Sequence, residues 1–294
     1  MSSIRISKNS SLQITPPNSV QNRDELIGYV EQSLEQFACL KGKGFRFALL
    51  EAKLVYVPAS EILGEIEDVI RKDLSIISTL QYANGRYVKA LEREIESDKP
   101  YINPLQIPFS VSNSVTGWIA LKHGIRGGNL TFNTSGCLSS IVAAINFISE
   151  QMSLGYVDKG LLLSGRFGGL YLSELTSPIQ TYSFLIERSD CNESEGILID
   201  FRGRYTSWND FMNQMQDLHL FSVIIETAVD LPVKPKSAKI IQNQTECSLL
   251  CDLLSSPIYF LNSLGIKHSN IAYVIVDSLK NINVLILELQ NVAF

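Results

Sequence analysis

The chain has 294 residues, of which 45% are hydrophobic and 19% are charged, and its formal net charge is −5. This composition predicts a globular protein with one large core or two modest ones. Lysine and arginine are dispersed, which excludes nucleic acid and anionic membrane surfaces as expected partners. The N-terminus lacks a signal-peptide core and no run reaches the roughly 18 apolar residues of a membrane span. We therefore expect a cytoplasmic protein.

The five cysteines predict thiols and no metal site. Their number is odd and they form no CxxC pair, which without a signal peptide argues against disulfides. Cys247 and Cys251 are four residues apart on a predicted helix, but no histidine or third thiol lies at ligand spacing, so buried packing is the better interpretation. We expect no cofactor. The five positions are Cys39, Cys137, Cys191, Cys247 and Cys251.

The first hundred residues predict helices, with one or two strands among them. Residues 1–20 are polar and contain two consecutive prolines, which favours a loose leader or an edge strand. Residues 24–37 have apolar side chains at helical spacing, and residues 45–57 alternate as in one or two strands. Ser60 is a predicted N-cap for a helix to about residue 71. A further helix over 85–96 is predicted to stop at the polar residues and proline of 97–100.

The next stretch predicts a strand, a sharp turn and a buried helix. Prolines keep residues 100–108 extended, and residues 111–121 are predicted to be helical. A short strand over 129–133 leads to a turn at 135–137. The helix predicted over 139–152 is apolar nearly all round, and the apolar run 161–165 is typical of a strand covered on both faces.

Cys137 lies at this strand-to-helix turn. The unpaired N–H groups and partial positive charge of a helix N-terminus favour a thiolate and can hold an oxyanion. A small buried residue at a helix start is an equally good interpretation of Cys137. The residue types thus leave a nucleophile and a packing role both open.

The second half repeats the outline of the first. Strands are predicted over 182–187, 197–201 and 220–226, with a helix from Ser207 and an exposed linker over 231–237. Residues 247–279 then repeat the apolar helix, glycine turn and hydrophobic strand of residues 137–165. Pro257 is a predicted kink or break in the second copy of the helix.

The segment from Asn103, NPLQIPFSVSNSVTGWIALKHGIRGGNLTFNTSGCLSS, followed by GYVDKGLLLSGRF, resembles the β-ketoacyl synthases. Those proteins show an Asn-x-x-x-Gly-x-x-Ala helix, a glycine turn, a Thr-Ala-Cys nucleophile and an Asp-x-x-Leu-x-Gly-Gly strand. Further on, Glu187 and Arg188 match a Leu-Glu-Arg segment of the same family. The matching positions in the main segment are Asn113, Gly117, Ala120, Gly124, Gly127, Thr131, Thr134, Cys137, Ser139, Gly155, Asp158 and Gly165.

The resemblance implies an α/β, thiolase-like fold, a duplicated βαβαβ unit in α-β-α-β-α layers with a compressed C-terminal half. It implies one domain over 1–294, with halves of about 21–178 and 179–294. Aligned without a gap from Gly127, Gly136 takes the nucleophile position, and one inserted residue brings Cys137 there. The family's two catalytic histidines are not found, because His123, His219 and His268 lie in none of its histidine motifs.

Three functions are compatible with these residues. The favoured one is a non-catalytic subunit, similar to chain-length factors, that pairs with an active ketosynthase and works with acyl carrier protein in fatty-acid, polyketide or polyene biosynthesis. The second is an active acyltransferase or condensing enzyme that uses Cys137 as nucleophile, and the third is a homodimeric, non-enzymatic binding protein. By position in the resemblance, the acyl tunnel or interface is expected at Phe109, Val111, Trp118, Leu130, Phe132 and Thr134.

Overall fold

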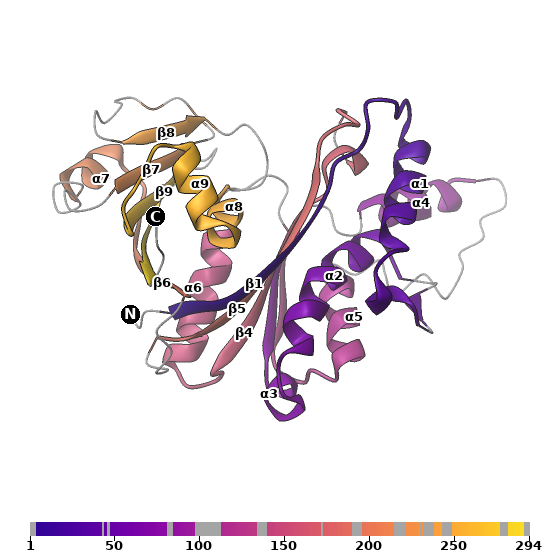
Figure 1. Ribbon diagram of the computed structural model, residues 1–294, viewed down its shortest axis with the longest axis horizontal. Coiled ribbons are helices and arrows are strands. Elements are labelled where there is room, and N and C mark those ends of the chain that lie inside the picture. Colours follow the sequence, from indigo (N-terminus) through magenta and orange to yellow (C-terminus); the bar gives the residue numbers. More distant parts are fainter. Residues whose placement is uncertain are drawn as a thin grey trace. The chain divides into compact units, whose positions relative to one another are not determined.

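The structure is a computed structural model with a mixed α/β fold (Figure 1). It describes residues 4–42, 44–45, 48–80, 85–97, 113–133, 140–171, 173–189, 196–214, 222–227, 229, 231, 238–242, 249–276 and 282–290. Across these residues, no helix combines the length and the hydropathy needed to cross a membrane.

Ten strands form one mixed sheet in the order β3-β2-β4-β5-β1-β6-β10-β9-β7-β8. The pairs β2/β3, β7/β8 and β7/β9 are parallel, whereas β10 is antiparallel to both of its neighbours. The strands are β1 (Ile4–Ile14), β2 (Ser75–Leu80), β3 (Asn129–Asn133), β4 (Lys159–Arg166), β5 (Ile179–Arg188), β6 (Gly196–Tyr205), β7 (Ser222–Thr227), β8 (Lys239–Gln242), β9 (Asn270–Val276) and β10 (Ile282–Gln290).

The strand order is the same in the two halves of the chain. We define the first half as β1 to β5 and the second as β6 to β10. Read from β3, the first half has the order third, second, fourth, fifth, first; read from β8, the second half has this order too. The internal repeat predicted from the sequence is therefore confirmed in the topology.

The helices are mostly short. They are α1 (Arg23–Leu34), α2 (Leu50–Gly64), α3 (Asp68–Lys72), α4 (Gly85–Ile95), α5 (Ser114–His123), α6 (Ser140–Ser153), α7 (Trp208–Gln214), α8 (Leu250–Ser255) and α9 (Pro257–Ser263), with the 3-10 helices η1 (Ala38–Leu40) and η4 (Gly168–Leu170). The break at Pro257 is confirmed, because α8 ends two residues before it and α9 begins on it.

Two compact units can be distinguished by their internal contacts. The first unit comprises Ser10–Ser135 and Leu161–Ser183. In it α2 and α5 pack against each other (Figure 1). Its core includes Leu54, Leu63, Ile76 and Leu80, all fully buried. Burial of such side chains contributes about 1.5–3 kcal/mol each.

The second unit comprises Met1–Asn9, Gly136–Gly160 and Phe184–Phe294. One of its apolar clusters joins α7 to strands β7, β9 and β10 and includes Phe211, Ile225, Val274 and Val284. Leu231 belongs to this cluster and is 9% exposed, although the sequence predicts an exposed linker there. The rest of that linker, residues 232–237, lies outside the described residues.

The prediction for the N-terminus is wrong. Residues 4–14 form strand β1, which lies between β5 and β6 and is therefore an interior strand. Ile4 and Ile6 are buried, and they pair with Ile199 and Ile197 of β6. The polar residues after Ile6 conceal the alternation, because only the two ends of the strand carry apolar side chains.

The strand prediction for residues 45–57 is also wrong. Residues 50–64 form helix α2, whose side chains are buried nearly all round, so a helical period is not visible in the sequence. Ser60 lies inside this helix and donates to the carbonyl of Val57, and a separate short helix, α3, follows. Strand β2, a fully buried run of six residues, was not predicted.

The remaining predictions that fall on described residues agree with the structure to within a few residues, whereas the extended segment 100–108 and the turn at 135–137 lie outside the described residues. Strand β3 has the predicted bounds, α6 begins one residue later than predicted, and α1, α4, α5, β4, β5, β6, α7 and β7 lie where the sequence places them. The α/β fold class is confirmed. The single domain with halves at about residue 178 stays a prediction.

Candidate functional site

The predicted nucleophile turn connects β3, which ends at Asn133, to α6, which begins at Ser140. Cys137, Gly136 and Thr134 lie outside the described residues, as do Phe109 and Val111. Whether Cys137 or Gly136 occupies the nucleophile position therefore stays a prediction. The strand that leads into the turn and its surroundings are described.

A chain of hydroxyl groups links β2, β3 and α5 next to this turn. Ser78 Oγ donates to Thr131 Oγ1 at 3.0 Å, and Thr131 Oγ1 lies 3.1 Å from Thr116 Oγ1. Thr116 in turn donates to the carbonyl of Asn113 at 3.0 Å. Because Thr116 uses its proton there, Thr131 is the donor to Thr116. Asn113 and Thr131, both found by resemblance, thus hold the start of α5 on the sheet.

A second hydroxyl pair lies deeper in the same unit. Thr79 Oγ1 of β2 donates to Ser164 Oγ of β4 at 3.2 Å, and both residues are almost fully buried. Burial of a hydroxyl is costly without a partner, so this pair fixes β2 against β4.

Gly127 has a packing role that explains its place in the family pattern. A Cβ atom on Gly127 would lie 2.1 Å from the carbonyl oxygen of Leu74, so only glycine allows this approach of two backbones. On either side, Arg126 N donates to Lys72 O and Ile76 N to Gly128 O, each at 2.8 Å. Gly127 and Gly128 therefore position β3 beside β2, which is a structural role.

Two adjacent ion pairs in the second unit join residues 158 and 159, at the start of β4, to residues 187 and 188, at the end of β5. Lys159 pairs with Glu187, a carboxylate only 3% exposed, and Arg188 pairs with Asp158 at 3.1 Å. Asp158, Glu187 and Arg188 all belong to the family pattern. Their contacts indicate that this part of the pattern stabilises the sheet.

His123 lies at the end of α5 in an aromatic cluster. Its ring stacks on Tyr56 with centroids 5.2 Å apart, Tyr56 packs on Trp118 at 5.3 Å, and Phe45 packs on Trp118 at 4.7 Å. Burial, and secondly the charge of Arg71, lower the pKa of His123 to about 4. The imidazole is therefore neutral at physiological pH.

Among the described residues the only other histidine is His268. His268 is exposed ahead of β9, and His219 lies outside the described residues. Trp118, expected at the tunnel or interface, is half-buried in the aromatic cluster. Leu130 and Phe132 of β3 are also half-buried.

The described residues contain no group of three or more potential metal ligands. Cys251 is buried on α8 and Cys39 is half-buried, and neither forms a disulfide with another described residue. A surface pocket near Phe45 was not predicted. Its lining comes from α1, η1, the start of α2 and the residues between them, and the sequence predicts strands where α2 begins.

Comparisons with known proteins identify the fold. The chain matches a structure described as the ishigamide ketosynthase/chain length factor with a TM-score of 0.63 and 13% identity, covering 99% of this chain and 100% of that one. The chain has a thiolase-like ketosynthase fold. The resemblance stated from the sequence is thus confirmed at the level of fold.

Two more structures with the ketosynthase fold support this assignment. One is a type II polyketide-synthase acyl-carrier protein in complex with its ketosynthase, at TM-score 0.60 and 10% identity, with 98% of this chain and 100% of that chain covered. The other is 3-oxoacyl-(acyl carrier protein) synthase III of Xanthomonas oryzae, at 0.51 and 11%, with 97% and 98% covered. No family model and no curated protein matches the sequence.

Proposed function

We propose that this chain is a ketosynthase-like subunit without condensing activity of its own. It pairs with an active β-ketoacyl synthase, which takes its substrates from acyl carrier protein in fatty-acid, polyketide or polyene biosynthesis. This role resembles that of a chain-length factor. The paired ketosynthase/chain length factor and the carrier-protein complex among the structural neighbours support the assignment.

The observation that carries the proposal is the position of β3. This strand ends the sheet order and pairs on one side with β2, so its other edge has no strand partner among the described residues. Leu130 and Phe132 on it are half-buried. An edge strand with apolar side chains is a template for pairing with another chain. We assign this edge to the partner synthase.

The described histidines support a role without catalysis. Decarboxylation of a malonyl extender needs polar groups next to the nucleophile, but the ring of His123 stacks on Tyr56 and His268 is exposed before β9. Within the proposal Leu130, Phe132 and Thr134 belong to the interface, and Phe109, Val111 and Trp118 to the wall of the acyl tunnel.

The pairing is tested by co-expression with a candidate ketosynthase, followed by size-exclusion chromatography with light scattering. The wild-type chain is expected to form a one-to-one complex. Leu130→Asp places a charge on the edge of β3 and should weaken the complex roughly ten-fold or more. Leu121→Asp is the matched control, because Leu121 is 84% exposed on α5. Equal complex formation by both variants would refute an interface at β3.

The lack of catalysis is tested separately on Cys137. The purified complex is incubated with acyl-loaded and malonyl-loaded carrier protein, and the intact mass of this chain is measured. We expect no acyl adduct. An adduct that disappears in Cys137→Ala, together with activity, would make the chain an acyltransferase. A homodimer that binds neither synthase nor carrier protein would indicate a binding protein of this fold.

A further inference from the structure

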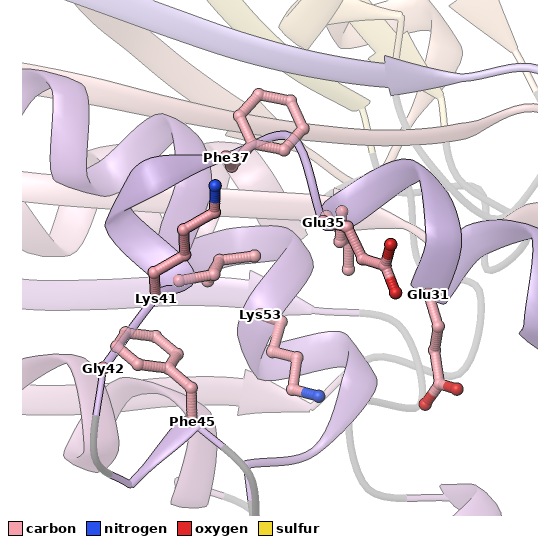
Figure 2. A pocket seen from close by; sticks show the side chains of 9 residues that line it. Glu31, Glu35, Phe37, Lys41, Gly42, Phe45 and Lys53 are labelled. Atoms are coloured by element: carbon pink, nitrogen blue, oxygen red, sulfur yellow. The ribbon is translucent and has the colours of Figure 1, made fainter.

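A surface pocket of about 530 Å³ lies in the first unit between the end of α1, η1 and the start of α2 (Figure 2). Its volume falls within the range of about 300–1,000 Å³ that is usual for small-molecule sites. Because all its lining residues belong to one unit, its shape does not depend on the other unit. The lining residues are Glu31, Leu34, Glu35, Phe37, Leu40, Lys41, Gly42, Phe45 and Lys53.

The floor of the pocket is apolar. Leu34 is 4% exposed and Phe45 is 8% exposed, whereas Phe37 and Leu40 are half-buried and so present part of their surface to the pocket. Phe45 is held from behind by edge-to-face packing on Tyr56 and Trp118 at 5.0 and 4.7 Å. This floor is anchored in the aromatic cluster and can accept a hydrocarbon chain.

The charges of the pocket are divided between two sides. Glu31 and Glu35 lie on one side, with Lys53 toward them, and Lys41 lies on the other (Figure 2). The two glutamates stand at the C-terminal end of α1, where the helix dipole is negative and the last turn has no basic residue. None of the four side chains forms an ion pair with another described residue.

We propose that this pocket binds an aliphatic monocarboxylate. The hydrocarbon chain lies on Leu34, Phe37, Leu40 and Phe45, and the carboxylate pairs with the ammonium group of Lys41. The glutamates on the opposite side repel a second negative charge, which selects a ligand with one anionic end. Lys53 offsets part of the glutamate charge. None of the lining residues belongs to β3, so the proposal does not rest on the proposed pairing.

Binding is measured by isothermal titration of the full chain with decanoate, kept below its micelle concentration. Decylamine and decanol, which have the same chain and a positive or neutral end, are titrated in parallel. We expect decanoate to bind at least about five-fold more tightly than either, the effect of one charge-assisted contact at an accessible site.

Variants locate the site. Lys41→Gln should weaken decanoate binding about five-fold without changing the affinity for decanol. Phe37→Ala should weaken both ligands, because it removes apolar surface from the floor. Lys89→Gln on exposed α4 is the matched control and should bind like the wild type. Thermal unfolding of each variant establishes that it is folded.

Three results would overturn the proposal. The first is equal binding of decylamine and decanoate, which would show that the charge division does not select an anion. The second is unchanged decanoate binding in both Lys41→Gln and Phe37→Ala. The third is a loss of binding in Lys53→Gln with none in Lys41→Gln, which would place the carboxylate on the other side of the pocket.

Discussion

The two halves of the chain share a framework but stabilise it differently. Helix α6 in the first half and α9 in the second end in the same way, with a left-handed glycine at Gly155 and Gly265. In the first, Gly155 N donates to Met152 O and Tyr156 N to Gln151 O. In the second, Gly265 N donates to Asn262 O and Ile266 N to Leu261 O. These are Schellman caps, and they define the turn before the fourth strand of each half.

The two halves differ in the side-chain contact between their second and fourth strands. In the first half, β2 and β4 are joined by the neutral pair of Thr79 and Ser164. In the second half, Glu226 of β7 is fully buried and accepts from Tyr273 of β9 at 2.8 Å and from the backbone N–H of Leu249 at 2.7 Å. This carboxylate thus joins two strands to the residue that precedes α8.

This difference shows how a compressed half keeps its fold. Helix α6 is one continuous helix of 14 residues, whereas Pro257 divides its counterpart into α8, of six residues, and α9, of seven. Short helices have little stability of their own. Tertiary contacts must therefore hold α8, and the hydrogen bond from Leu249 N to Glu226 is one of them.

The largest effect is expected for Glu226→Ala. This change leaves the Tyr273 hydroxyl and the Leu249 N–H without their buried acceptor, and should lower the free energy of unfolding by about 3 kcal/mol. Glu226→Gln keeps an amide oxygen and should cost about 1 kcal/mol, as should Thr79→Val in the first half. Urea denaturation of the three variants measures the contrast. If Glu226→Ala costs no more than Thr79→Val, the carboxylate does not anchor α8.

The sequence predicted the parts of this framework that carry local signals. Strand β3, helix α6 and strand β4 were placed because glycines and serines bound clear apolar runs. Gly155 and Gly265 were placed as turns for the same reason. The contact of Glu226 with Leu249 was not predictable, since it joins residues 23 apart and arises only when β7 and β9 are side by side.

The errors fall where tertiary burial hides the local pattern. Helix α2 is buried all round, and β1 is interior although most of its middle is polar. At the candidate site, Asn113 and Thr131 were found only by resemblance, because their hydrogen-bond chain joins separate elements. The pocket could not be predicted, because it forms only when α2 is a helix and lies beside α1. Patterns along the chain do not report contacts of this kind.

The second largest effect is expected on acid stability and comes from His123 in the first half. The pKa of His123 is about 4 in the folded chain, below its usual value of 6.5. The imidazole therefore binds a proton more tightly in the unfolded chain than in the folded one. Stability should be unaffected above pH 6.5 and should fall as the pH drops toward 4. We expect the free energy of unfolding to fall by about 2 kcal/mol. A fully buried ring would give a larger decrease, but the ring of His123 is partly exposed.

Urea denaturation between pH 7 and pH 4 tests this expectation by comparing variants with the wild type. In His123→Phe the part of the pH dependence that comes from the imidazole should disappear, and the aromatic packing on Tyr56 should be retained. His268→Phe, at the exposed position before β9, is the matched control. If the His123 variant keeps the wild-type slope, the half-buried imidazole does not control acid stability.

The smallest effect tests whether the two halves are equivalent where they look alike. Gly155 and Gly265 have φ angles of 74° and 70°, and an added Cβ would meet nothing closer than 3.9 Å at the first and nothing within 4 Å at the second. Substitution by alanine should therefore cost only the backbone strain, about 1 kcal/mol at each site. Asparagine, which tolerates the left-handed region, should cost less. Equal losses by urea denaturation would show that the two caps contribute alike to stability. A much larger loss at Gly265 would instead make the cap of α9 a second anchor of the shorter half.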